Sequence, residues 1–145
     1  MAEITKLPPR PGLKGCYDGL RDAGCDVYAV TNGGRETSLK YYELAGIELD
    51  SEHLLSCDDI RKAKPDVAVY ETAHRHLTAR GLGAEGDGER WFVAVHAWDL
   101  IAARKAGFRT AYLDFEEHDP VTAVFGEFDL YASSMEELLQ KMKAL

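Results

Sequence analysis

Short apolar runs alternate with helical patterns along this chain, and this alternation constrains its fold more than any other feature. The clearest runs occupy residues 27–30 and 91–95. The run at 27–30 is too short for a helix and has turn residues on both sides, and the run at 91–95 is the most hydrophobic strand candidate. Strands that alternate with helices of about ten residues indicate a parallel sheet with helices on both faces. The sequence therefore predicts an α/β fold.

The expected elements follow from apolar spacing and from glycine stop signals. We expect strands at residues 27–30, 54–57, 91–95, 110–113 and 129–132, and helices at 11–23, 36–45, 65–78, 97–106 and from Ser133 or Ser134 to about 142. Pro65 is expected to open its helix, because its missing N–H would be unpartnered there in any case. The glycine-rich, acidic residues 79–89 are expected to form an exposed loop.

Composition narrows the class of protein. A chain of 145 residues, 46% of them hydrophobic, is long enough for one domain with a core, and we expect one domain over residues 1–145. The formal net charge of −8 opposes binding to nucleic acid. No apolar run approaches the roughly 20 residues that span a bilayer, and no signal-peptide pattern is present. We therefore expect a cytoplasmic protein that binds neither nucleic acid nor membrane.

Cysteine and histidine spacing gives no sign of a metal centre. Cys16, Cys25 and Cys57 are far apart and form no Cys-x-x-Cys pair, so we interpret them as reduced thiols in structural positions. His74 and His76 are two residues apart on an expected helix and should face different directions. The sequence predicts no metal site and no cofactor.

Polar residues gather at three boundaries between expected elements. In an open α/β sheet, ligands bind beyond the carboxyl ends of the strands, where strands give way to helices. The candidate site residues at these boundaries are Thr31, Asn32, Gly33, Lys64, His96 and Asp99.

The order of these motifs resembles the haloacid dehalogenase superfamily, in particular its L-2-haloacid dehalogenase branch. A strand ending in Thr-Asn-Gly is followed by Lys-Pro-Asp and then by a strand ending in His-Ala-Trp-Asp. The segment Ala-Trp-Asp followed by Ala-Ala-x-x-Ala-Gly-Phe points to that branch. The resemblance extends from about Leu7 to about Leu139 and implies a Rossmann-like sheet and a metal-free hydrolase.

At the boundary that follows the strand at 27–30, the resemblance implies that Thr31 and its neighbouring backbone amides hold the acidic group of a substrate. Asn32 would lie near the leaving group, and Gly33 would be structural. The alternatives are a helix N-cap role for the Thr31 hydroxyl and, for Asn32, a turn residue that tolerates left-handed geometry.

The other two boundaries lie before the helix expected at 65–78 and after the strand expected at 91–95. At the first of these, the resemblance implies that the Lys64 ammonium keeps a nucleophilic carboxylate ionised and correctly oriented. Asp99 would orient the hydrolytic water or this lysine. The alternatives are a solvated lysine, with Lys62 as the competitor for the role, and an ordinary acid in the first turn of a helix. We interpret Trp98 as a packing residue.

Three positions depart from the family pattern. Phosphatases of the superfamily carry an acid for Mg²⁺ where this chain has Val95, so a phosphatase is disfavoured. The dehalogenase branch commonly has serine and asparagine where this chain has Ala94 and His96. His96 is therefore either a hydrogen-bonding or general-base group or a structural residue.

The family's nucleophile, an aspartate in an Asp-x-x-Gly-Thr-like turn on the first strand, has no counterpart in the sequence. Asp26 is the nearest match, but it begins the strand that ends at Thr31 and should lie at the opposite edge. The cap segment is also missing. The gap left in the sheet would be filled by Glu3-Ile4-Thr5, by pairing of the flanking strands, by a second copy, or by a separate N-terminal polypeptide.

The sequence thus predicts the core of a 2-haloacid dehalogenase, which acts on short 2-haloacids through an aspartyl ester and is inactive as this fragment. Its ligand would be a small acid or anion. The alternatives are a catalytically inactive domain kept for binding or assembly and, less favoured, a small-molecule phosphatase.

Overall fold

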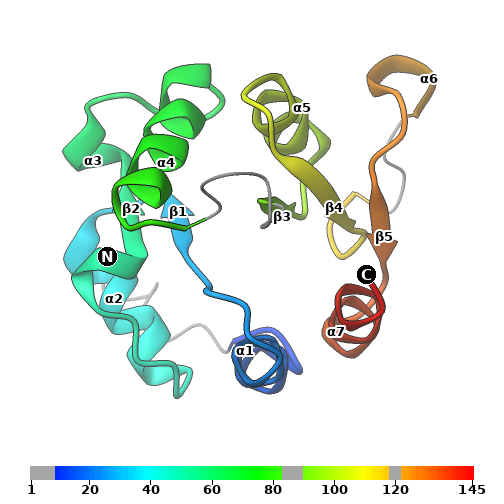
Figure 1. The fold of residues 1–145 in the computed structure, drawn as a ribbon, viewed down its shortest axis with the longest axis horizontal. Coiled ribbons are helices and arrows are strands. Elements are labelled where there is room, and N and C mark those ends of the chain that lie inside the picture. The colour runs from blue at the N-terminus through cyan, green and yellow to red at the C-terminus, as the bar shows by residue number, and fades with distance from the viewer. Residues whose placement is uncertain (1–8, 83–89, 118–121) are drawn as a thin grey trace. The chain divides into compact units, whose positions relative to one another are not determined.

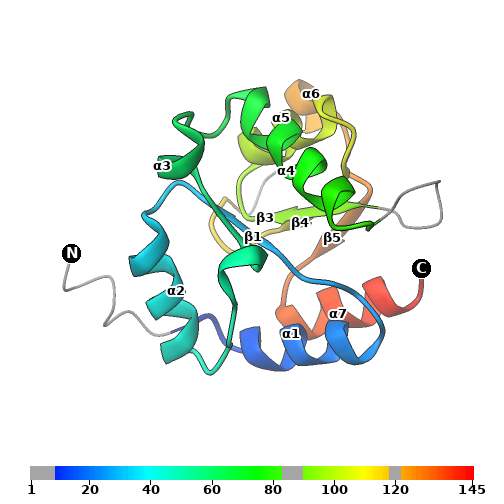
Figure 2. The same cartoon turned by 60° about the vertical axis from the view of Figure 1, so that its left-hand side comes forward.

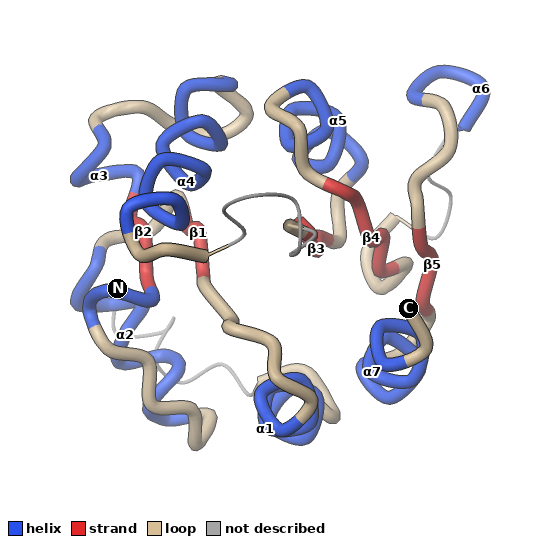
Figure 3. The backbone as a smooth tube through the Cα atoms, viewed as in Figure 1, coloured by secondary structure: helices blue, strands red, loops and turns tan. Residues whose placement is uncertain are grey.

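The computed structural model describes residues 9–82, 90–117 and 122–145. The chain divides into two compact units, one formed by residues up to 63 together with 135–145, and the other by residues 64–134. The strands form two parallel sheets, drawn in red in Figure 3, and each unit holds one of them. None of the described helices is long and apolar enough to cross a membrane.

The first unit is built on a two-stranded sheet. β1 (Ala29–Thr31) and β2 (Leu54–Ser56) pair in parallel, with Thr31 opposite Ser56. The elements around them are α2 (Arg35–Leu44), the 3-10 helix η2 (Ser51–His53) and α3 (Cys57–Ile60). β2 is the more buried strand, since Leu54 and Ser56 are fully covered.

Two helices that are far apart in the sequence lie side by side in this unit. These are α1 (Leu13–Asp22) and α7 (Met135–Lys143), which pack together and are neighbours in Figures 1 and 2. Gly19 marks the closest approach, because a Cβ at this position would lie 2.6 Å from a methyl carbon of Leu139. The lack of a side chain at Gly19 therefore lets α7 pack tightly on α1.

The second unit is built on a three-stranded parallel sheet. The strands β3 (Trp91–Ala94), β4 (Arg109–Leu113) and β5 (Leu130–Ala132) follow this order across the sheet. The helices of this unit are α4 (Val67–Ala79), α5 (Ala97–Lys105) and α6 (Thr122–Phe125). β4 is central and almost wholly buried, and α5 packs on β3, β4 and α4. This arrangement sets the start of α5 at the carboxyl end of β3.

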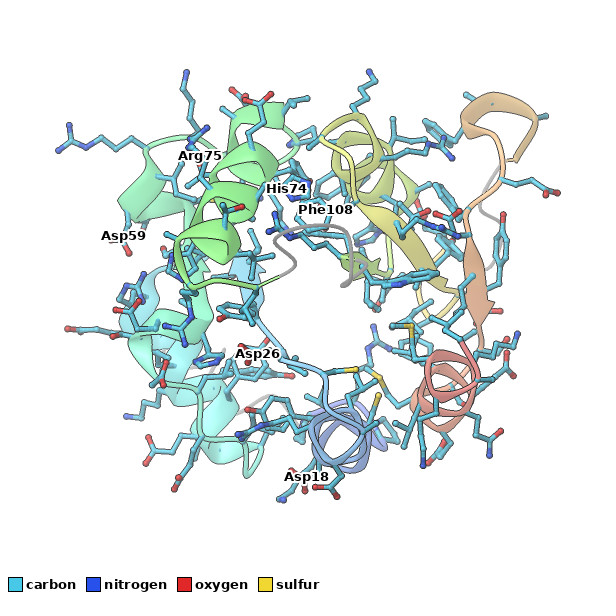
Figure 4. All side chains as sticks on the ribbon, viewed as in Figure 1. Asp18, Asp26, Asp59, His74, Arg75 and Phe108 are labelled. Atoms are coloured by element: carbon cyan, nitrogen blue, oxygen red, sulfur yellow. The ribbon has the colours of Figure 1, made fainter. Side chains whose placement is uncertain are left out.

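His74 is part of the core of this second unit. Its ring stacks on the Phe108 ring with centroids 3.9 Å apart, and its Nδ1 accepts from Arg90 at 3.0 Å. Figure 4 labels His74 and Phe108 close to one another. Burial and the charge of Arg90 lower the pKa of His74 below its ordinary value. Within the described parts of the chain, no three His, Cys, Asp or Glu side chains gather as a metal site.

Two sequence expectations need correction. Pro65 does not open its helix, because Asp66 is the N-cap and accepts from Ala68 N at 2.9 Å, so that α4 begins at Val67. The short helix α3 was not expected, and the Ser56 hydroxyl caps it.

Two further expectations lie largely outside the described residues. These are the Glu3-Ile4-Thr5 segment and most of the expected loop at 79–89, of which 83–89 are not described. A single domain over residues 1–145 stays a prediction.

Candidate active site

A buried ion pair joins two of the candidate residues. Lys64 Nζ lies 2.9 Å from Asp99 Oδ2, and the two side chains are 13% and 8% exposed. Lys64 precedes the cap of α4, whereas Asp99 belongs to the first turn of α5. Removing two charges from water is costly unless further polar contacts satisfy them. The stability of the Lys64–Asp99 pair therefore depends on the polar contacts that its neighbours supply.

Tyr70 supplies one such contact. Its hydroxyl donates a hydrogen bond to Asp99 Oδ1, and the tyrosine is fully buried on α4. The Phe92 ring packs 5.1 Å from the Tyr70 ring and lies 5.7 Å from Lys64 Nζ, close enough for a cation–π contact. Both carboxylate oxygens of Asp99 thus have a donor, one charged and one neutral.

The burial of Lys64 does not fit a solvated lysine at the start of a helix. Asp99 does lie in the first turn of α5, as its alternative states, but it is buried against Lys64. Lys62, the competing lysine, is exposed. The sequence analysis did not single out Tyr70, which lies within the helix expected at 65–78. The signal available was that a buried tyrosine hydroxyl needs a hydrogen-bond partner.

His96 occupies the N-cap position of α5, but its side chain makes no capping hydrogen bond. Glu117 takes that role instead, since its Oε1 accepts from Ala97 N at 2.8 Å. The other oxygen, Oε2, lies 3.8 Å from His96 Nδ1. The Trp98 ring stacks on the His96 ring at 5.7 Å and is 39% exposed, so Trp98 packs at the surface and not in the core.

The turn after β1 is held by its own polar groups. Thr31 Oγ1 accepts from Gly33 N at 3.0 Å, and the N-cap of α2 is Gly34, without a side-chain cap. The alternative that the Thr31 hydroxyl caps the helix is therefore wrong. Asn32 is exposed and does not have left-handed backbone geometry, which among the described non-glycine residues only Arg61 adopts. Asn32 does lie in the turn after β1, as its alternative states, but without the left-handed backbone.

Ser56 fixes the same turn from the neighbouring strand. Its buried hydroxyl donates to Gly33 O at 2.8 Å and accepts from Asp58 N at 3.2 Å. A Cβ on Gly33 would come within 3.3 Å of Thr31 Oγ1 and 3.2 Å of Ser38 Oγ, which gives a steric reason for glycine here. The hydrogen bonds of Thr31 and Ser56 thus hold the backbone of the turn at Gly33.

Asp26 lies before β1, at the end of the strand opposite to Thr31. Its Oδ1 lies 2.8 Å from His53 Nε2, and its Oδ2 accepts from the Tyr28 hydroxyl at 3.1 Å. Both oxygens are thus engaged, in agreement with the interpretation that Asp26 is not the nucleophile.

The candidate residues fall into two groups. Thr31, Asn32 and Gly33 lie in the first unit, and Lys64, His96 and Asp99 lie in the second. Of these, the structure brings Lys64 into contact with Asp99 and sets His96 beside Glu117, a residue that the sequence analysis did not single out.

No family model matches the chain, but individual proteins do. Haloacetate dehalogenase H-2 of Moraxella sp. (strain B) is 30% identical over 112 residues, which are 77% of this chain and 47% of that protein. (S)-2-haloacid dehalogenase 2 of Pseudomonas sp. (strain CBS-3) is 27% identical over 77% of this chain and 46% of its own length. A crystal structure of an L-2-haloacid dehalogenase superposes with a TM-score of 0.81 at 25% identity, covering 98% of this chain and 60% of that one.

The chain is related to the L-2-haloacid dehalogenases. It spans about half the length of the curated dehalogenases it matches. The predicted α/β fold with parallel strands is confirmed by its likeness to dehalogenase structures. The roles of Lys64, Asp99 and His96 are treated below as proposals.

Proposed function

We propose that these 145 residues carry the positioning part of a 2-haloacid dehalogenase site, acting on a small acid in the cytoplasm. The observation that supports this most is the buried Lys64–Asp99 pair with Tyr70. A lysine held by an acid at a fixed place is suited to aiming a second carboxylate. The sequence contains no Asp-x-x-Gly-Thr turn, so the proposal takes the nucleophilic carboxylate from outside the 145 residues.

In the first step, an oxygen of that carboxylate forms a bond to C2 of the haloacid while the carbon–halogen bond breaks, and halide leaves with the electron pair. Lys64 keeps the attacking carboxylate ionised. Thr31, Asn32 and the amide of Gly33 would bind the carboxylate of the substrate or the departing halide. A fixed turn favours this role because its donors need no rearrangement during the reaction.

In the second step, water attacks the carboxyl carbon of the aspartyl ester. The water's oxygen bonds to this carbon and one of its protons passes to a base. The bond between the carboxyl carbon and the substrate oxygen then breaks, and this oxygen takes up a proton to become the hydroxyl group of the product. The products are a 2-hydroxyacid and the regenerated carboxylate. Asp99 and His96 are the candidate groups for activating the water.

The absence of the Asp-x-x-Gly-Thr turn supports a second candidate, an inactive domain that binds an anion or a partner. The partner would be another copy of the chain or a separate polypeptide. A phosphatase is disfavoured by Val95, which cannot be a Mg²⁺ ligand.

The test is halide release from 2-chloropropionate, measured with the chain alone and with the chain joined to the nucleophile strand and cap segment of a related dehalogenase. We expect no release by the chain alone. The joined protein should release halide in the presence of EDTA, and Lys64→Ala should lower the rate by about 10²-fold or more.

Lys62→Ala is the matched control, because Lys62 is exposed, and this variant should keep its activity. Halide release by the chain alone would refute the external nucleophile. A folded but inactive joined protein would favour the binding domain, and Mg²⁺-dependent phosphate release would favour the phosphatase.

A further inference from the structure

Two groups compete for the role of proton acceptor in the second step of the proposed reaction. The Asp99 side chain is 8% exposed, and each of its oxygens already accepts a hydrogen bond, one from Lys64 and one from Tyr70. Its burial leaves a water molecule little access to these oxygens. The His96 side chain is 41% exposed and makes no capping hydrogen bond, so it is the more accessible base.

Glu117 is held beside this histidine by a fixed set of contacts. Its Oε1 accepts from Ala97 N at 2.8 Å and from the Tyr112 hydroxyl at 3.2 Å. Tyr112 is 1% exposed on the central strand β4, so its hydroxyl is a rigid anchor. With one oxygen fastened in this way, the other is left facing His96 Nδ1.

The 3.8 Å between Glu117 Oε2 and His96 Nδ1 is an ion-pair distance and longer than a hydrogen bond. At this distance the charge of the carboxylate still favours a proton on Nδ1 over one on Nε2. Stacking on Trp98, with an interplanar angle of 12°, restrains the plane of the His96 ring. The ring is thus held between an anchored carboxylate at one nitrogen and an aromatic neighbour along its face.

We infer that Glu117 is a positioning residue that holds neutral His96 as the Nδ1–H tautomer, leaving Nε2 to accept a proton from water. A neutral imidazole has one donor and one acceptor nitrogen, and a carboxylate at Nδ1 makes that nitrogen the donor. In the second step, the proton of the attacking water then moves to Nε2 as its oxygen bonds to the ester carbon. This assignment rests on the proposed function, whereas the tautomer itself does not.

The experiment measures the tautomer directly, by ¹⁵N NMR of the His96 ring in the 145-residue chain at a pH where the ring is neutral. We expect the Nδ1–H form to predominate in the unmodified chain. Glu117→Gln keeps an acceptor for Ala97 N but removes the charge, and the ring should shift towards the Nε2–H form that free histidine prefers. Glu117→Ala should do the same, so that the result does not depend on one variant folding.

Glu71→Gln is the matched control, because Glu71 is exposed on α4 and this variant makes the same chemical change. It should leave the tautomer unchanged. An Nε2–H ring in the unmodified chain, or a ring unaffected by both Glu117 substitutions, would overturn the inference. These outcomes need no halide release, so they are independent of the dehalogenase test.

Discussion

Each unit of this protein holds a cluster of acids and a base beside a tyrosine, and the two clusters differ in their access to water. In the second unit, Lys64 and Asp99 are 13% and 8% exposed. In the first, His53 lies 2.7 Å from Asp50 and 2.8 Å from Asp26, with exposures of 21%, 67% and 36%. The ion-pair distances are alike, so distance alone does not tell which cluster matters for stability. Burial decides which cluster matters more. Water screens the exposed charges and solvates them if a partner is lost, whereas a buried charge that loses its partner is left unsolvated.

The largest effect should come from breaking the buried pair. Asp99→Asn leaves the charge of Lys64 without a counterion, and we expect a loss of about 3–5 kcal/mol in the free energy of unfolding. Urea unfolding measures it. The control is Asp59→Asn, which breaks the exposed contact with Arg35 at 2.7 Å and should cost less than about 1 kcal/mol. Equal losses in the two variants would contradict the comparison.

A smaller effect should follow from removing one neutral donor of the same cluster. Tyr70→Phe keeps the buried ring but takes the hydroxyl from Asp99 Oδ1. We expect a loss of about 1.5–3 kcal/mol, since hydrogen bonds to charged groups fall in this range. Tyr17→Phe, which removes an exposed contact with Arg21, should change stability by less than about 0.5 kcal/mol. A Tyr70→Phe protein as stable as this control would show that Lys64 alone satisfies Asp99.

The smallest effect should be the pH dependence of the exposed cluster. Burial alone lowers the pKa of His53, but hydrogen bonds and charges from Asp50 and Asp26 outweigh it and raise the pKa above 6.5. The hydrogen bond from His53 in turn lowers the pKa of Asp50 below 3.8. The contribution of His53 is therefore complete below pH 6.5 and is lost as the pH rises through the pKa of the folded state.

His53→Gln should accordingly cost more stability at about pH 5.5 than at about pH 9. The measurement is the difference in unfolding free energy between this variant and the unmodified chain at each pH. The shifted pKa of His74 affects both proteins and cancels in that difference. A difference that is equal at both values, or larger at about pH 9, would refute the raised pKa.

The sequence predicted the strands well because each is a short apolar run between turn residues. The order of the motifs identified Lys64 and Asp99 as candidate residues. Their contact was not predicted, because it joins residues that lie in different elements and depends on how those elements pack. Tyr70 was missed because a tyrosine on an apolar helix face has the same spacing as a packing residue. Glu117 was missed because it follows β4 in an irregular stretch, where no periodicity marks a residue that caps another helix.

The packing of α7 on α1 has a consequence for how the chain folds during synthesis. The second unit is continuous in sequence, so all its strands and helices are available once residue 134 has left the ribosome. The first unit begins earlier but must wait for α7, which is translated after the whole of the second unit. Domains generally fold in the order of translation. Here, by contrast, we expect the unit whose translation begins first to be the last to complete its packing.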